Sequence, residues 1–369
     1  MKILITGAQG FVGKNLAAEL KNRGYENIFE YDRDTDKVFL DTYTRECDFI
    51  FHLAGVNRPD DESEFDLGNR GFTHALIENL RKHNNNCPIV VSSSTQAELN
   101  NLYGISKKAA EDEVFAYAKA SGARSMVYRL PNIFGKWCRP YYNSVVATFC
   151  HNIARGLEIT VNDPKTELTL CYIDDLIYEF MQALEGNSTE NGLYYSVPTT
   201  YHVRLGELAS LINSFSQSRK DLYIPDMEDD FTRKLYSTYL SYLPQDEFAY
   251  DLKMNCDQRG SFTEFIRTPE RGQVSVNVSK PGITKGNHWH STKNEKFLVV
   301  SGKGLIRFRK IDSGEIIEYA VAGDKLQVID IPPGYAHSIV NVGDSDLVTI
   351  MWANECFDPE RLDTYLNEF

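Results

Sequence analysis

The sequence predicts an α/β protein in which a doubly wound parallel sheet is followed by an all-β domain. Up to about residue 240, short apolar runs alternate with longer stretches of helical periodicity, which is the pattern of βαβ units. Beyond that point the strands are short, alternate polar with apolar residues and are separated by glycine turns, as in a sandwich or jelly roll. The 369 residues suffice for two domains, which we place at 1–243 and 247–369.

The expected elements follow from this periodicity. Apolar runs predict strands at residues 2–6, 28–31, 49–53, 89–92 and 125–129, with helices between them, among them 13–23 and 72–83. In the second domain, period-two segments predict strands at 273–278, 297–300, 305–308 and 347–351.

Charge and composition exclude several classes of protein. Lys and Arg number 39 against 52 Asp and Glu, a net charge of −13, so we expect neither nucleic acid nor a membrane as a partner. Glycine interrupts the N-terminal apolar run at residue 7 and no long apolar segment follows, so we expect a cytoplasmic protein. The seven cysteines are scattered without a Cys-x-x-Cys pair, which argues against disulfides and thiolate metal sites.

A glycine-rich loop follows the first predicted strand and opens a helix. Its sequence is Gly-Ala-Gln-Gly-Phe-Val-Gly, and its glycines allow a tight turn and the close approach of a pyrophosphate to a helix N-terminus. The loop therefore predicts a dinucleotide site formed by Gly7, Gly10, Phe11, Val12 and Gly13.

The residues at the end of the second predicted strand bear on the choice of cofactor. Asp32 suits the ribose 2′-hydroxyl of NAD, whereas Arg33 suits the 2′-phosphate of NADP. We expect NADPH, because a guanidinium matches a phosphate and Asp32 alone would repel one.

A second group of polar residues indicates acid–base chemistry. Tyr103 and Lys107 are four residues apart and share one face of a helix. A nearby lysine cation favours the phenolate, so we expect a lowered pKa for Tyr103 and proton exchange with an alcohol or ketone oxygen. A hydroxyl of the segment 92–95, after the preceding strand, is placed to polarise the same carbonyl.

Residues 1–240 resemble the extended short-chain dehydrogenase/reductase family, a Rossmann-type fold whose members act on nucleotide sugars. The similar motifs are the glycine loop, the Tyr103 and Lys107 pair, and the segments 48–55, 69–73, 129–135 and 172–176. The resemblance implies Ser94, Tyr103 and Lys107 as the catalytic set, with Ser93 and Thr95 as competitors for Ser94. It adds to the cofactor-binding residues Leu53, Ala54, Gly55, Asn69, Tyr103, Lys107 and Asn132.

The chain departs from that family in two places. The connection from Ser94 to Tyr103 is short, which implies a more open pocket. Thr95-Gln96-Ala97 stands where sugar dehydratases of the family carry an Asp-Glu pair, so we do not expect dehydration.

The second domain resembles the cupins. His288, His290 and Glu295 fit the first cupin motif and His337 the second. Residues i and i+2 of a strand point the same way, so both early histidines face the barrel interior. Three imidazoles and a carboxylate suit Zn, Mn, Fe, Ni or Cu, and the resemblance favours zinc.

Two upstream segments are similar to the deoxysugar 3,5-epimerase branch of the cupins. They are residues 257–264 and 285–288. In that branch the histidine matching His288 is a base, and the cation matching Lys285 approaches the diphosphate. Because His288 also completes a metal set here, its role as a free base stays open.

The fusion of the two domains resembles bifunctional enzymes of capsule and O-antigen synthesis on the route to UDP-N-acetyl-L-fucosamine. It implies a homodimer that binds a UDP-linked keto-deoxy amino sugar. The cupin would epimerise C3 and the first domain would reduce the C4 ketone with NADPH, giving UDP-2-acetamido-2,6-dideoxy-L-talose. One alternative is a nucleotide-sugar 4-reductase or 4-epimerase whose cupin is only a structural dimerisation module, and another is an NADP-dependent sensor without turnover.

Overall fold

The computed structural model describes residues 1–311, 314–360 and 363–367, and the chain divides into two compact units. The first comprises Met1–Asn213 and Asp229–Pro244, and the second Ser214–Glu228 and Gln245–Phe369. The boundary falls inside helix α8 (Leu205–Asp221), so a segment before residue 243 groups with the second unit. The predicted division at 243–247 stays a prediction.

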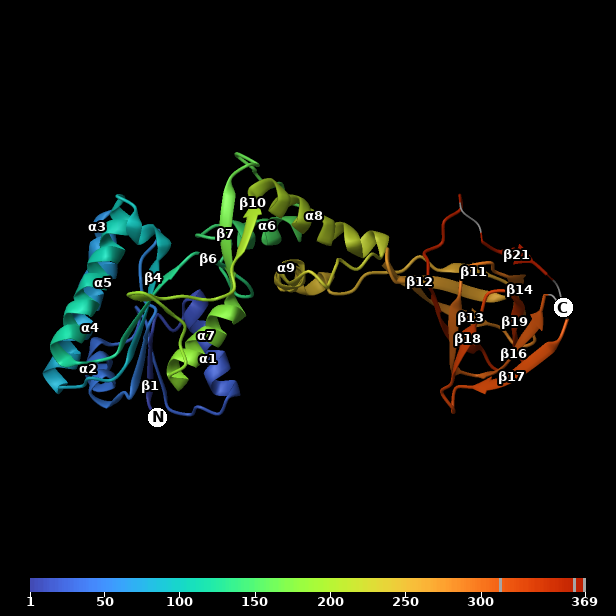
Figure 1. The fold of residues 1–369 in the computed structure, drawn as a ribbon, viewed down its shortest axis with the longest axis horizontal. Helices are drawn as coiled ribbons and strands as arrows, with labels where there is room; N and C mark the ends of the chain where they lie inside the picture. The colour runs from blue at the N-terminus through green and yellow to red at the C-terminus, as the bar shows by residue number, and fades with distance from the viewer. Residues whose placement is uncertain (312–313, 361–362, 368–369) are drawn as a thin grey trace. The chain divides into compact units, whose positions relative to one another are not determined.

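The first unit contains the predicted alternation of strands and helices (Figure 1). Its strands are β1 (Ile3–Thr6), β2 (Ile28–Tyr31), β3 (Phe49–His52), β4 (Ile89–Ser94), β5 (Ser125–Leu130), β6 (Asn132–Phe134), β7 (Glu167–Tyr172), β8 (Glu190–Asn191), β9 (Tyr194–Tyr195) and β10 (Tyr201–Arg204). Its helices are α1 (Phe11–Asn22), α2 (Lys37–Glu46), α3 (Ser63–Phe65), the π-helical η1 (Asp66–Gly71), α4 (Phe72–His83), the 3₁₀ helix η2 (Thr95–Glu98), α5 (Leu102–Ser121), α6 (Val145–Ile153), α7 (Ile173–Glu185) and α9 (Asp230–Leu240).

The main sheet has the strand order β2-β1-β3-β4-β5-β9-β8, and every pair from β2 to β9 is parallel. Helices α2, α4 and α5 cover one face and α1 and α7 the other (Figure 1). Ile3 and Ile5 pack toward α1 and α7, whereas Leu4 packs on the opposite side. The apolar runs of the sequence therefore reflect strands buried on both faces, and the doubly wound prediction is confirmed.

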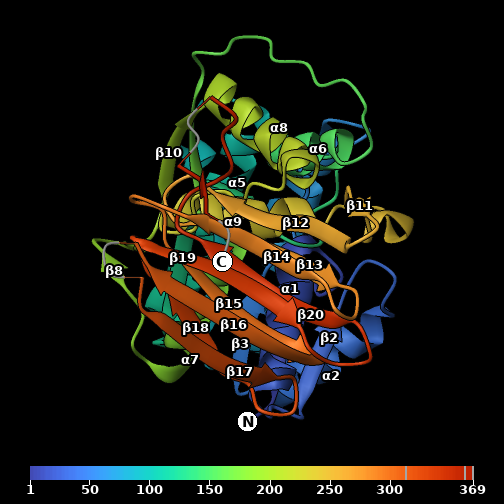
Figure 2. The ribbon, with the colours of Figure 1, turned by 90° about the vertical axis from the view of Figure 1, so that its right-hand side faces the viewer.

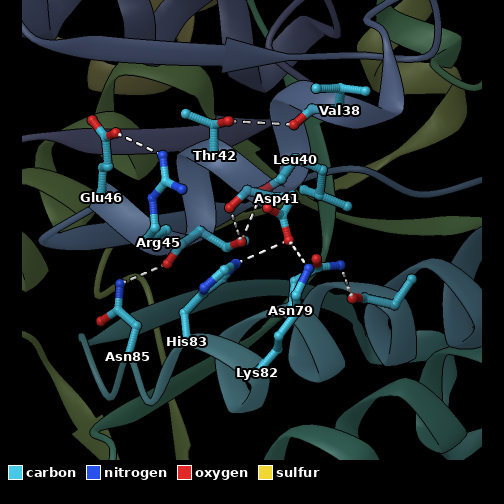
Figure 3. A network of polar contacts seen from close by, with 12 residues as sticks. Val38, Leu40, Asp41, Thr42, Arg45, Glu46, Asn79, Lys82, His83 and Asn85 are labelled. Carbon is cyan, nitrogen blue, oxygen red and sulfur yellow. Dashed lines mark hydrogen bonds and ion pairs between the residues drawn. The ribbon is translucent and has the colours of Figure 1, made fainter.

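Helices α2 and α4 are joined by polar contacts (Figure 3). Asp41 Oδ1 accepts hydrogen bonds from Lys82 Nζ at 2.6 Å and from His83 Nε2 at 2.9 Å. These two contacts hold the pKa of Asp41 below its usual range. Asn85, just after α4, donates to the Thr44 carbonyl at 2.8 Å, so both helices are fixed on one face of the sheet.

The second unit is formed by antiparallel strands, as predicted (Figure 2). They are β11 (Asn255–Asp257), β12 (Gly260–Thr268), β13 (Gly272–Ser279), β14 (Thr284–Trp289), β15 (Glu295–Ser301), β16 (Lys303–Lys310), β17 (Ile316–Ala322), β18 (Val328–Ile331), β19 (Tyr335–Asn341), β20 (Leu347–Ala353) and β21 (Tyr365–Leu366), with a 3₁₀ turn η3 (Gln245–Glu247) before them. One sheet has the order β11-β12-β13-β20-β15-β18 and the other β17-β16-β19-β14-β21. Side chains from both sheets, including Phe297 and Phe308, form its core.

Two further expectations bear on the whole chain. All seven cysteines have free thiols, in agreement with the prediction from their spacing. Among the residues that the structure describes, no helix is both long and apolar enough to cross a membrane.

A chain of hydrogen bonds with a fixed direction passes through the buried His52 at the end of β3. The Thr6 hydroxyl lies 2.7 Å from His52 Nδ1, and His52 Nε2 lies 2.9 Å from the Thr73 hydroxyl. Because Thr73 donates onward to the Asn69 carbonyl, His52 carries its proton on Nε2 and accepts at Nδ1. Burial, with the charge of Lys107, lowers the pKa of His52 to about 3, so this imidazole is neutral.

This shift predicts how stability depends on pH. The pKa of His52 is about 6.5 in the unfolded chain and about 3 in the folded chain. Between these pH values the unfolded chain binds a proton that the folded chain does not, so the free energy of unfolding falls as the pH falls. Replacing His52→Gln should reduce the loss in unfolding free energy between pH 7 and pH 5 by about 2 kcal/mol, measured by urea titration. His202→Gln, at an exposed histidine, is the matched control. The same pH dependence in wild type and His52→Gln would contradict the assignment.

Candidate active sites

The glycine loop has no room for side chains. A Cβ at Gly13 would lie 2.2 Å from the Gly7 carbonyl oxygen, and one at Gly7 would lie 2.8 Å from the Ala54 nitrogen. Gly10 is the N-cap of α1 and offers no side chain to its free amides, and Phe11 and Val12 form the half-buried first turn. The loop and uncapped helix start thus fit a pyrophosphate.

The two residues expected to select the cofactor differ in their surroundings. Asp32 accepts hydrogen bonds from the Gln9 amide at 2.7 Å and from the Arg33 amide at 2.8 Å. The Asp32 carboxylate therefore stabilises the glycine loop through the Gln9 amide. The side chain of Arg33 is exposed beside it.

Lys107 and Asn69 both lie against Gly55, and Asn69 also against Val56, in the segment that follows β3. Lys107 Nζ donates to the Ser92 carbonyl at 3.1 Å, and a Cβ at Gly55 would lie 2.9 Å from the same Nζ. Asn69, in the π-helical η1, exchanges two hydrogen bonds of 2.9 Å with the backbone of Val56. The structure thus brings together three predicted site residues from three elements. Burial lowers the pKa of Lys107 to about 8.

Tyr103 is half-buried on the first turn of α5, within hydrogen-bonding reach of Ser94. Burial raises the pKa of Tyr103, and the contact with Ser94 offsets only part of that rise. The pKa of Tyr103 is therefore above its usual value, the opposite of the lowered pKa expected from its pairing with Lys107, and burial is the largest cause. Ser93 instead donates to the buried Glu111 at 2.5 Å and Thr95 is exposed, so of the three hydroxyls Ser94 faces the phenol.

The short connection between Ser94 and Tyr103 packs on Gly104. A Cβ at Gly104 would lie 2.3 Å from the Gln96 carbonyl oxygen and 2.5 Å from that of Leu99. Asn101 caps α5 by accepting a hydrogen bond from the Gly104 amide at 2.7 Å. The glycine after Tyr103 thus lets the shortened segment lie directly against the helix that carries the phenol.

The remaining predicted cofactor residues lie on different elements. Leu53 donates to the Thr6 carbonyl at 3.1 Å, and Ala54 follows it against the glycine loop. Asn132 is exposed on β6, and no contact among the described residues ties its side chain to Tyr103 or Lys107.

In the second unit, the four predicted metal ligands converge. One ligand atom from each of His288, His290, Glu295 and His337 lies within 4.8 Å of the others. Three of them are placed by strands, because His288 on β14 pairs with His337 on β19 and Glu295 begins β15 in the other sheet. The fourth, His290, follows the end of β14.

Several of these ligand atoms are buried without a hydrogen-bond partner. They are His290 Nε2, Glu295 Oε2 and His337 Nε2. The Nδ1 atom of His337 faces the Tyr335 carbonyl at 3.4 Å, and its Nε2 lies 3.3 Å from Glu295 Oε2 within the cluster. Burial lowers the pKa of His288 to about 4, and the contacts of Glu295 with two histidines hold its pKa below the usual range against its own burial. Three imidazoles and a carboxylate, with buried ligand atoms that lack hydrogen-bond partners, are a donor set that fits a divalent cation.

The ligand cluster lines a cavity of about 350 Å³ that also contains Lys285. Lys285 Nζ donates to Asn277 Oδ1 at 2.8 Å and to the Val278 carbonyl at 2.9 Å. Burial lowers the pKa of Lys285. The cavity therefore presents a cation held by uncharged oxygens.

Two polar side chains that lie at or near the candidate sites, those of His52 and Asp363, were not identified from the sequence. His52 is a polar residue that ends an apolar strand, and that signal was available in the sequence. Asp363, which contacts the turn after His290, lies outside both metal motifs and has no local signal.

Comparison with known proteins identifies the family of the chain. Residues 3–197 match the NAD dependent epimerase/dehydratase family, and residues 255–365 match a polysaccharide biosynthesis C-terminal domain. The chain is 45% identical to a UDP-2-acetamido-2,6-beta-L-arabino-hexul-4-ose reductase from Pseudomonas aeruginosa, over 99% of this chain and 98% of that protein.

Solved structures with a similar fold include a full-length relative and several that cover only part of the chain. The capsular polysaccharide assembling protein CapF from Staphylococcus aureus has 55% identity and a TM-score of 0.95, with both chains covered completely. A UDP-glucose 4-epimerase from Thermotoga maritima, at 20% identity and a TM-score of 0.55, covers 66% of this chain and 98% of its own, which shows the fold alone. With one family model over more than half of its length, the chain belongs to the NAD dependent epimerase/dehydratase family, and it is similar to CapF throughout.

Proposed function

We propose that the chain is a bifunctional nucleotide-sugar enzyme of capsule or O-antigen synthesis. The second unit would epimerise C3 of a UDP-4-keto-6-deoxy-N-acetylhexosamine, and the first would reduce its C4 ketone with NADPH to UDP-2-acetamido-2,6-dideoxy-L-talose. The observation that carries the proposal is that one chain holds both the Ser94, Tyr103 and Lys107 group and a cavity lined by four metal-ligand side chains. The name of the Pseudomonas aeruginosa relative, a reductase of a UDP-linked 4-keto sugar, supports the substrate class.

The first site is suited to reduction. A nicotinamide nucleotide bound at the glycine loop would supply the hydride. The raised pKa of Tyr103 keeps its phenol protonated at neutral pH, which is the form required to protonate an alkoxide at C4. Ser94 lies beside that phenol to orient the carbonyl oxygen, and Lys107 places positive charge next to Gly55.

The second site is suited to proton exchange at carbon. A ketone at C4 acidifies the C3 proton, and removal of that proton places negative charge on the C4 oxygen. A divalent cation held by His288, His290, Glu295 and His337 would supply Lewis acidity. The ammonium of Lys285 adds fixed positive charge to the same cavity, where an enolate oxygen would be stabilised.

The two reactions have a required order. Epimerisation needs the C4 ketone and is reversible, whereas reduction consumes the ketone and fixes C3.

We propose zinc as the metal and a homodimer as the assembly. We further propose NADPH as the cofactor, because Asp32 is committed to the glycine loop while Arg33 is exposed to meet a phosphate.

Replacing Tyr103→Phe should slow ketone reduction by about 10²-fold to 10⁴-fold, since the proton donor is lost. NADPH binding, measured by fluorescence titration, should be nearly unchanged. Tyr178→Phe, at an exposed tyrosine of α7, is the matched control. Reduction by Tyr103→Phe at the wild-type rate would refute the role of Tyr103.

Replacing Arg33→Ala should raise KM for NADPH much more than KM for NADH, because only NADPH carries the 2′-phosphate. Steady-state kinetics with both cofactors measure the ratio, and Arg45→Ala on α2 controls for loss of a nearby exposed charge. An equal effect on both cofactors would show that Arg33 does not select between them.

Replacing His290→Ala should remove the metal and suppress C3 proton exchange while NADPH binding persists. Exchange is followed by NMR in deuterium oxide without nicotinamide, and metal by elemental analysis. Glu318→Ala, at an exposed carboxylate of β17, should retain both metal and exchange. Full exchange in metal-free His290→Ala protein would contradict a metal-assisted epimerisation.

A further inference from the structure

The turn between β14 and β15 crosses from one sheet to the other and joins two of the proposed metal ligands. His290 follows the end of β14, Glu295 begins β15, and residues 291–294 connect them. The separation of these two ligands therefore depends on how this turn is held. The turn lies far in sequence from the segment that holds it.

Asp363 binds three successive amides of the turn. Its Oδ1 accepts from the Ser291 amide at 2.8 Å, and its Oδ2 accepts from the amides of Thr292 and Lys293, each at 2.8 Å. The Thr292 hydroxyl adds a fourth hydrogen bond at 3.1 Å. One carboxylate thus accepts from three of the four amides of the turn, and the fourth, that of Asn294, donates to Asn354 Oδ1 at 3.0 Å.

The backbone of the same residue contacts a metal ligand. The Asp363 carbonyl is hydrogen-bonded to His290 Nδ1, and a carbonyl only accepts, so Nδ1 carries the proton. His290 Nε2 is then the acceptor atom of the neutral ring; it makes no hydrogen bond and lies 3.6 Å from Glu295 Oε2, inside the ligand cluster. This is the arrangement by which an outer hydrogen bond sets the tautomer of a metal-binding histidine.

The residues that follow fasten Asp363 to the ligand strand. β21 lies beside β14 (Figure 1). In this pairing His288 lies opposite Leu366 and Trp289 opposite Tyr365. The rings of Trp289 and Tyr365 stack with centroids 4.8 Å apart. Segment 363–367 is thus attached along β14 as well as at the turn.

We propose that segment 363–367 is a structural part of the metal centre, in which Asp363 is a positioning residue that fixes the 291–293 turn and the tautomer of His290. This inference rests on the proposed metal centre. It adds that affinity for the ion depends on a carboxylate that does not touch the ion.

The test measures Zn²⁺ affinity of the full chain by competition with a chromophoric chelator. Asp363→Asn should weaken binding about 10-fold to 100-fold, because its amide nitrogen cannot accept from the turn. Far-UV circular dichroism and the melting temperature of the metal-free protein should stay close to wild type, which separates positioning from loss of fold. Asp358→Asn, which alters another carboxylate that caps an amide near the C-terminus, should bind Zn²⁺ like wild type.

Hydrogen exchange of the wild-type protein gives a second measurement that does not require a variant. Removing Zn²⁺ should raise exchange in the turn after His290 and in segment 363–367 together, but not in β13. Wild-type affinity in folded Asp363→Asn protein, or no change in segment 363–367 on metal removal, would overturn this inference alone. A wild-type protein that binds no Zn²⁺ would refute the metal centre and this inference with it.

Discussion

The close approach of α1, β1 and β3 at the glycine loop is the constraint on which the first site depends. Side chains at Gly7 or Gly13 would overlap backbone atoms, so only glycine allows the strand to turn directly into the helix. The parallel register then places the ends of β1, β3 and β4 side by side, with Thr6 opposite His52 and His52 opposite Val91. The cofactor loop, Gly55 and the hydroxyl residues at the end of β4 consequently lie at one edge of the sheet, where α5 carries the Tyr103 phenol and the Lys107 amine.

The second unit reaches its site through a different constraint, which is the alternation of side chains in antiparallel sheets. His288 and His337 pair across β14 and β19, whereas Glu295 comes from the facing sheet. Burying these atoms without partners costs free energy unless an ion or a ligand satisfies them. The cluster is therefore hard to explain as packing alone. Lys285 lines the same cavity and adds a cationic side chain to its polar lining.

The sequence predicted what is local and missed what is brought together over long distances. Strands β1 to β5 and four strands of the second unit, both folds and the convergence of the four expected ligands could be predicted, because each is encoded in a motif or in the local periodicity of the sequence. The remaining strands were not predicted. The raised pKa of Tyr103 could not be predicted, since its largest cause is burial, which depends on how the tertiary structure covers the phenol. Asp363 lies more than 70 residues after His290 and carries no motif, so only the tertiary structure shows that it holds the turn. The grouping of 214–228 with the second unit was likewise absent from the periodicity.

The central claim is that one chain performs proton exchange at C3 and hydride transfer to C4 of the same sugar. It is tested most directly by incubating the wild-type protein with a UDP-4-keto-6-deoxy-N-acetylhexosamine in deuterium oxide with unlabelled NADPH, and by determining the product by NMR. The account predicts a single reduced product with deuterium at C3, inverted configuration there, and unlabelled hydrogen at C4. A reduced product that retains hydrogen and the original configuration at C3 would contradict it.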